Sequence, residues 1–153
     1  MIYFEDLKVG TIADYGSYEV TREEVLEFAR KYDPQPFHLS DDEAAKTHFG
    51  RIAASGWHTA AMTMRLCVAS DFRPAGGILG IGGELNWLKP VRPGDTLRVV
   101  TDIVELRASA SKPDRGICRL RQVTINQRGE PTMEQETTVF LKRRPVAVAA
   151  VRS

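Results

Sequence analysis

Hydrophobic and polar positions change their spacing about halfway along the chain. After a strand-like stretch at 11–20, the first half follows helical spacing: an apolar stripe runs from Val25 to Tyr32, and Trp57 to Val68 is apolar on nearly every face. From Ile78 onward the pattern is that of strands separated by glycine and proline turns. It predicts helices over 21–32, 40–47 and 55–70, and strands over 11–20, 78–88, 96–106, 117–126 and 133–142.

The first predicted helix has clear ends. Thr21–Glu24 has the capping-box pattern that begins a helix, and Val20 with Val25 fits the hydrophobic staple that accompanies it. Pro34 stops the helix, because a proline pushes the residue before it out of the helical region. Asp33 is therefore expected at the C-terminal end of this helix.

The turn that follows carries the first candidate chemistry. Its two prolines each fix their own φ, so Tyr32–His38 is predicted to be a stiff, extended turn. The turn holds the carboxylate of Asp33 near the imidazole of His38, and the two groups could share one water molecule. Such a pair suits general acid–base catalysis near neutral pH. The alternative is a solvated loop with an incidental histidine.

The start of the apolar helix is the second candidate. Ser55 is a good N-cap, and Gly56 allows the backbone to approach a ligand closely. Unpaired N–H groups at a helix N-terminus can hold a carbonyl oxygen that gains negative charge. With such a helix end, an enoyl thioester could add water: Asp33 would take a proton from the water that His38 holds.

The strand region shows two irregularities. In 117–126 the apolar positions change phase from Cys118 and Leu120 to Val123 and Ile125, which predicts a bulge. The glycines within 78–88 predict a sharply curved or bulged strand. Residues 143–153 have no periodicity, so we expect a single domain of residues 1–142 followed by a loose C-terminal tail 143–153.

Composition excludes several classes of partner. A chain of 153 residues with 42% hydrophobic and 27% charged residues is an ordinary globular domain. Its net charge of +1 offers no basic field, so we expect no nucleic-acid partner. The apolar runs are too short to cross a membrane and the N-terminus lacks a signal peptide, so we expect a cytoplasmic protein with no membrane partner.

The cysteines and histidines indicate neither a metal site nor a redox motif. Cys67 and Cys118 have no CxxC spacing and are expected to be buried thiols of a reducing compartment. His38, His48 and His58 are ten residues apart, which does not place them on one helix face. We therefore expect no metal and no cofactor.

The turn with the prolines resembles the Asp-x-Asn-Pro-x-His signature of the MaoC-like dehydratases, a family that includes the (R)-specific enoyl-CoA hydratases. Asp33, Pro36 and His38 fall in register with it, while Gln35 replaces the asparagine. Lys89–Asp95 also resembles the family's Pro-Val-x-x-Gly-Asp segment, which marks the fold more than the catalytic site.

The resemblance covers roughly residues 3–142 and implies an α+β hot dog fold, in which an antiparallel curved sheet wraps around one long central helix. It also implies reversible addition of water to a trans-2-enoyl-CoA thioester, with Asp33 as general base and His38 orienting the water. The backbone N–H at Gly56 would polarise the thioester. We expect the acyl-CoA substrate to contact four further residues, namely Gln35, Phe37, Ser55 and Trp57, and bulky aromatics to favour a compact acyl group.

Two other functions fit the same fold. Many hot dog acyl-CoA thioesterases place an acid in or near the central helix, but residues 56–70 contain no Asp or Glu. A non-catalytic acyl-CoA-binding protein would gain nothing from the pair of Asp33 and His38. Unpaired sheet edges and a helix too apolar for one small sheet to cover favour a homodimer or a dimer of dimers.

Overall fold

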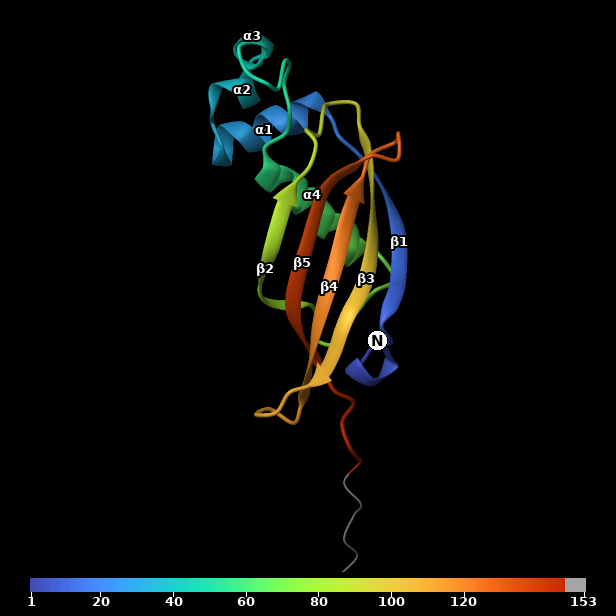
Figure 1. Cartoon of the computed structure of the whole chain (residues 1–153). Helices are drawn as coiled ribbons and strands as arrows, with labels where there is room; N and C mark the ends of the chain where they lie inside the picture. Colours follow the sequence, from blue (N-terminus) through green and yellow to red (C-terminus); the bar gives the residue numbers. More distant parts are fainter. Residues whose placement is uncertain (148–153) are drawn as a thin grey trace, which may run out of the picture.

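A computed structural model of the chain describes residues 1–147 as a five-stranded antiparallel sheet curved around one long helix (Figure 1). In chain order the elements are η1 (Phe4–Asp6), β1 (Gly10–Glu19), α1 (Arg22–Tyr32), α2 (Pro36–Leu39), α3 (Asp41–Ala45), α4 (Gly56–Ala69), β2 (Leu79–Trp87), β3 (Thr96–Ala108), β4 (Arg115–Ile125) and β5 (Pro131–Lys142). The predicted α+β hot dog fold is confirmed.

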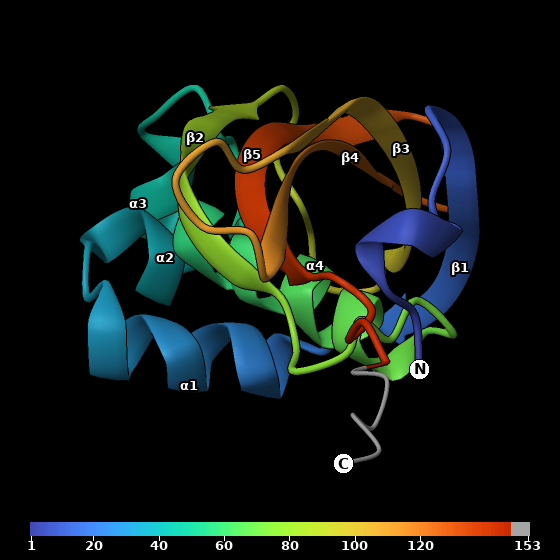
Figure 2. The same ribbon diagram turned by 90° about the horizontal axis from the view of Figure 1, so that it is seen from below.

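The sheet has the strand order β1-β3-β4-β5-β2, and every neighbouring pair is antiparallel. Seen from below, it curls around α4, while α1, α2 and α3 gather at one end beside β2 (Figure 2). The core lies between α4 and the concave face of the sheet, where Met62, Leu66 and Cys67 of the helix are buried. Strands β1 and β2 are the two edges of the sheet.

One face of α4 is not covered by the described residues. The helix was predicted to be buried on most faces, but Trp57, Met64 and Val68 are 63%, 46% and 52% exposed. They lie on one stripe, because their spacing returns to the same side of a helix. A single sheet covers only the inner side of α4, so this outer stripe stays open. No helix within residues 1–147 is both long and apolar enough to cross a membrane.

The two predicted strand irregularities have different outcomes. The glycines of β2 do mark a bulge, since the pairing with β5 shifts register between Gly80 and Gly82. The bulge predicted inside β4 is wrong. Its positions alternate strictly between buried and less buried, and where the pairing with β5 shifts register between Thr124 and Ile125, the extra residue is Thr132 of β5. The inward positions after Leu120 are the polar Gln122 and Thr124, both hydrogen-bonded inside the core. Their satisfied hydrogen bonds allow a regular strand to carry polar residues inward.

The first helix begins as predicted. Thr21 Oγ1 accepts a hydrogen bond from the Glu24 N–H at 3.2 Å, and Val20 and Val25 are buried in one cluster. The helix ends at Tyr32. The N–H of the next residue, Asp33, still donates a hydrogen bond to the Ala29 carbonyl at 2.9 Å. Asp33 is thus held rigidly against the end of α1.

The segment after Asp33 differs from the prediction. Gln35 is extended, with φ −80° and ψ 143°, but Pro36–Leu39 form the short helix α2. An extended conformation through His38 is therefore wrong. Proline at the first position of a helix loses no hydrogen bond, and its fixed φ already suits the helix. His38 consequently lies on a helical turn, with its backbone N–H donating to the Gln35 carbonyl at 3.0 Å.

Residues near the start of the chain contact the segment that follows β5. Arg143 Nε and the Arg144 N–H both donate to the carboxylate of Glu5, each at 2.9 Å. The hydrogen bond from Arg144, followed by that from Arg143, lowers the pKa of Glu5 to about 2. The predicted loose tail thus starts with two hydrogen-bonded residues, and 148–153 lie outside the described residues.

Candidate active site

The ends of three helices bring Asp33, His38 and Ser55 together. Asp33 follows α1, His38 lies on α2, and Ser55 directly precedes α4. The Nε2 atom of His38 is 3.4 Å from Asp33 Oδ2, and the two side chains are only 6% and 16% exposed. The predicted pairing of the carboxylate with the imidazole is therefore present in the fold.

The orientation of His38 is set by its other ring nitrogen. Nδ1 is 2.8 Å from the carbonyl oxygen of Ala53. A carbonyl oxygen only accepts hydrogen bonds, so Nδ1 carries a proton. In the neutral ring Nε2 is then an unprotonated acceptor that faces Asp33. Two acceptors that face each other are well suited to hold the two hydrogens of one water molecule.

Two side chains hold the carboxylate of Asp33. Ser55 Oγ donates to Oδ2 at 2.7 Å, and Gln35 Nε2 donates to Oδ1 at 2.6 Å. Burial raises the pKa of Asp33, but the hydrogen bonds from Ser55 and Gln35, together with the positive charge that His38 carries when it is protonated, outweigh it. The resulting pKa lies below the ordinary value, so the carboxylate is ionised at neutral pH and ready to accept a proton.

Replacing Ser55 by alanine should raise the pKa of Asp33. Ser55→Ala removes a hydrogen bond that lowers this pKa, so the carboxyl group takes up its proton at a higher pH than in the wild type. The measurement is an NMR titration of the Asp33 side chain, with Ser17→Ala on β1 as control. An Asp33 titration that is unchanged in Ser55→Ala would contradict this role.

Three of the four residues expected to bind substrate contact Asp33 or His38 and do not line the cavity. Ser55 occupies the N-cap position of α4, but its side chain makes no capping hydrogen bond, so the predicted hydroxyl cap is wrong. Its hydroxyl and the Gln35 amide are both directed to Asp33. Phe37 packs edge-on against His38, with ring centroids 4.7 Å apart, and stacks on Phe49. These contacts position Asp33 and His38.

A cavity of about 410 Å³ opens beside the pair. Asp33, His38, Gly56 and Trp57, all predicted site residues, line it. Other lining residues were not predicted from the sequence, namely His48, Phe49, Ala54, Thr59, Trp87, Leu88, Lys89, Pro90 and Val91. Most of these belong to the segment just before α4 or to the turn after β2, which become neighbours only in the folded chain.

Trp87 explains why residue 56 is glycine. Its indole Nε1 donates to the Gly56 carbonyl at 2.8 Å, and its ring meets Trp57 edge-on at 5.2 Å. A Cβ added to Gly56 would overlap the indole of Trp87. The missing side chain therefore admits an aromatic ring from β2 over the first turn of α4, at the wall of the cavity.

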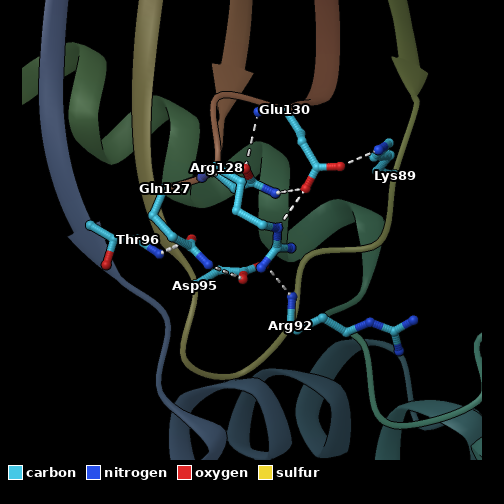
Figure 3. A network of polar contacts seen from close by, with 8 residues as sticks. Lys89, Arg92, Asp95, Thr96, Gln127, Arg128 and Glu130 are labelled. Atoms are coloured by element: carbon cyan, nitrogen blue, oxygen red, sulfur yellow. Dashed lines mark hydrogen bonds and ion pairs between the residues drawn. The ribbon is translucent and has the colours of Figure 1, made fainter.

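The turn after β2 forms one wall of the cavity, and the polar contacts drawn in Figure 3 hold it in place. Asp95 accepts a hydrogen bond from the Arg92 N–H at 2.9 Å, which closes the turn. Glu130, in the hairpin between β4 and β5, accepts from both Lys89 and Arg128. The hydrogen bonds from Lys89 and then Arg128 lower the pKa of Glu130 to about 2. The turn therefore has a structural role, and it keeps Lys89 at the rim of the cavity.

Within residues 1–147, no group of three or more His, Cys, Asp or Glu side chains is placed to hold a metal ion. The polar side chains that line the cavity include Asp33, His38, His48, Thr59 and Lys89. Fold and site together define a class of protein. It is a hot dog domain with a carboxylate–imidazole pair at the start of its central helix.

A family model described as "MaoC like domain" matches residues 8–122, and the chain belongs to this family. The resemblance noted in the sequence is therefore confirmed. The solved structure of a MaoC-like dehydratase from Rhodospirillum rubrum is 45% identical, covers 95% of this chain and 100% of that chain, and superposes with a TM-score of 0.92.

Two relatives extend the comparison. A 3-hydroxybutyryl-CoA dehydratase of Methylorubrum extorquens is 36% identical over 107 residues, which are 69% of this chain and 66% of that protein. The uncharacterized protein YdeM of Bacillus subtilis is 28% identical over 142 residues, which are 91% of this chain and 98% of that protein. The similarity thus extends over nearly the full length of the chain.

Proposed function

We propose that the protein is an (R)-specific enoyl-CoA hydratase, or 3-hydroxyacyl-CoA dehydratase in the reverse direction. The observation that carries the proposal is the pair of Asp33 and His38, 3.4 Å apart, lining the same cavity as the first residue of α4. The similarity to a 3-hydroxybutyryl-CoA dehydratase supports hydro-lyase chemistry on a CoA thioester.

In the proposed reaction, one water molecule bridges Asp33 Oδ2 and His38 Nε2. The Asp33 carboxylate removes a proton from it while the water oxygen bonds to the β-carbon of the enoyl group. The electron pair of the double bond moves toward the thioester oxygen, where N–H groups at the start of α4, at Gly56, stabilise the negative charge. The proton held by Asp33 then passes to the α-carbon. Dehydration follows the same steps in reverse.

The same geometry weakens the thioesterase alternative. The only carboxylate of the cavity, among residues 1–147, belongs to Asp33 at the end of α1, and α4 carries no acid. A non-catalytic acyl-CoA-binding role does not account for the hydrogen bonds that hold Asp33 ionised beside His38. Hydration, by contrast, gives a role both to the N–H groups at the start of α4 and to the imidazole of His38.

The test is the loss of the enoyl thioester absorbance with a panel of trans-2-enoyl-CoAs of four to twelve carbons. Trp57, Trp87 and Phe49 wall the cavity, so we expect kcat/KM to be highest for the short members. A methylene that finds no room forfeits about 0.8 kcal/mol of burial. A steady rise of kcat/KM with chain length would contradict the compact pocket. Release of free thiol without formation of the 3-hydroxyacyl product would favour a thioesterase.

We also propose that the protein acts as a homodimer, or as a dimer of dimers. Leu79 and Ile81 of the edge strand β2 are 59% and 51% exposed, and Met64 and Val68 on the open stripe of α4 are 46% and 52% exposed. A two-fold axis could cover both surfaces with the same surfaces of a second copy. Light scattering should give at least twice 17.1 kDa, and a mass near 17.1 kDa at micromolar concentration would contradict the proposal.

A further inference from the structure

Helices α1 and α4 have a second polar contact outside the cavity. The ring of His58, only 3% exposed, stacks on Phe28 of α1 with centroids 4.6 Å apart and planes 6° from parallel. His58 Nε2 lies 3.2 Å from Glu24 Oε1, and Tyr18 of β1 donates its hydroxyl to the same oxygen. Glu24 Oε1 of α1 thus contacts side chains of both β1 and α4.

Packing alone does not explain a histidine at this position. A carboxylate only accepts hydrogen bonds, so the proton lies on Nε2, and Nδ1 is left as an acceptor. Nδ1 of His58 is buried and has no hydrogen-bond partner within residues 1–147. A buried polar atom without a partner destabilises the fold, and in native proteins it calls for a reason beyond stability.

The location of His58 suggests that reason. It follows Gly56 by two residues, while Glu24 and Phe28 lie on the helix whose end delivers Asp33. Ser55 Oγ already ties the start of α4 to Asp33 Oδ2 at 2.7 Å. The contact of Ser55 fixes only one point of the first turn of α4 against α1. The contact of His58, one helical turn further on, fixes a second point and with it the rotation of this turn against α1.

We propose that His58 is a positioning residue, which holds the N–H groups at the start of α4 in register with the Asp33 carboxylate through its contacts with Glu24 and Phe28. The proposal rests on the hydratase function proposed above. A misplacement of about 1 Å between reacting groups can reduce a rate on the order of 100-fold, so a modest rotation of this turn is enough to affect turnover.

The decisive comparison is between His58→Leu and His58→Gln. Leucine keeps an apolar contact with Phe28 and removes the unpaired nitrogen, so we expect an unchanged or higher Tm. It also removes the bond to Glu24, so kcat for crotonyl-CoA should fall on the order of tenfold while KM changes less than about twofold. Glutamine can donate its amide N–H to Glu24 and should restore kcat to within about threefold of wild type.

Three further variants separate positioning from stability. Glu24→Leu should reproduce the kcat loss, and the double variant with His58→Leu should be no slower than either single one, because both break the same link. Thr63→Val breaks a buried hydrogen bond of α4 to Thr124, 2.6 Å long, away from the cavity. This control should lower Tm and leave kcat unchanged.

A folded His58→Leu protein with wild-type kcat overturns the proposal. So does a series in which kcat follows Tm across all variants, Thr63→Val included. If wild type hydrates no member of the enoyl-CoA panel, the hydratase function fails, and the backbone amide NMR signal of Gly56 tests the positioning on its own. That signal should shift in His58→Leu and return in His58→Gln; an unmoved signal in His58→Leu overturns the proposal.

Discussion

Replacing Asp33 by asparagine should reduce hydration of crotonyl-CoA by on the order of 100-fold or more. Asparagine keeps the shape of the side chain but cannot accept a proton from water. Ser55 Oγ and Gln35 Nε2 both donate to the Asp33 carboxylate, whereas an amide offers one accepting oxygen. One of these donors would therefore face an N–H₂ group, and a small loss of stability should accompany the loss of rate.

Steady-state hydration rates and circular dichroism check this result together. Asp42→Asn is a matched control, because Asp42 is an exposed acid in the first turn of α3. It should keep the wild-type rate. A folded Asp33→Asn protein with a nearly full hydration rate would remove Asp33 from the mechanism, and the proton acceptor would then have to be sought elsewhere in the cavity.

Gly56→Ala should also lower kcat/KM by on the order of 100-fold. The new methyl group would overlap the indole of Trp87 and displace it from the Gly56 carbonyl, to which it donates a hydrogen bond of 2.8 Å. The first turn of α4 or the wall of the cavity must then move. Alanine favours helices over glycine, so a loss of helix propensity cannot cause the effect.

The control and the rescue both follow from the same geometry. At Gly80 of β2 an added Cβ meets only Thr137, at an ordinary 3.7 Å, so Gly80→Ala should keep the wild-type rate. In the Gly56→Ala background, Trp87→Ala removes the overlapping ring and should recover part of the lost activity. Wild-type kcat/KM in Gly56→Ala would show that the position of Trp87 does not matter for turnover.

The sequence by itself determined those features that depend on neighbouring residues. Thr21 and Pro34 delimit α1, because caps and prolines act on the backbone within one helical turn. The short distance along the chain between Asp33 and His38 allowed the pairing of this carboxylate with this imidazole to be predicted. It did not reveal that His38 would lie on a helical turn, because proline at position 36 is compatible with an extended segment and equally with the start of a helix.

Only the tertiary structure decided which side chains surround Asp33, His38 and the start of α4. The contacting residues are far apart in the sequence: 22 positions separate Ser55 from Asp33, 31 separate Trp87 from Gly56, and 34 separate His58 from Glu24. No local pattern encodes such contacts, because they depend on how helices and strands pack after they form. For the same reason Ser55 could be interpreted as a cap from the sequence, although its hydroxyl holds the carboxylate of another helix.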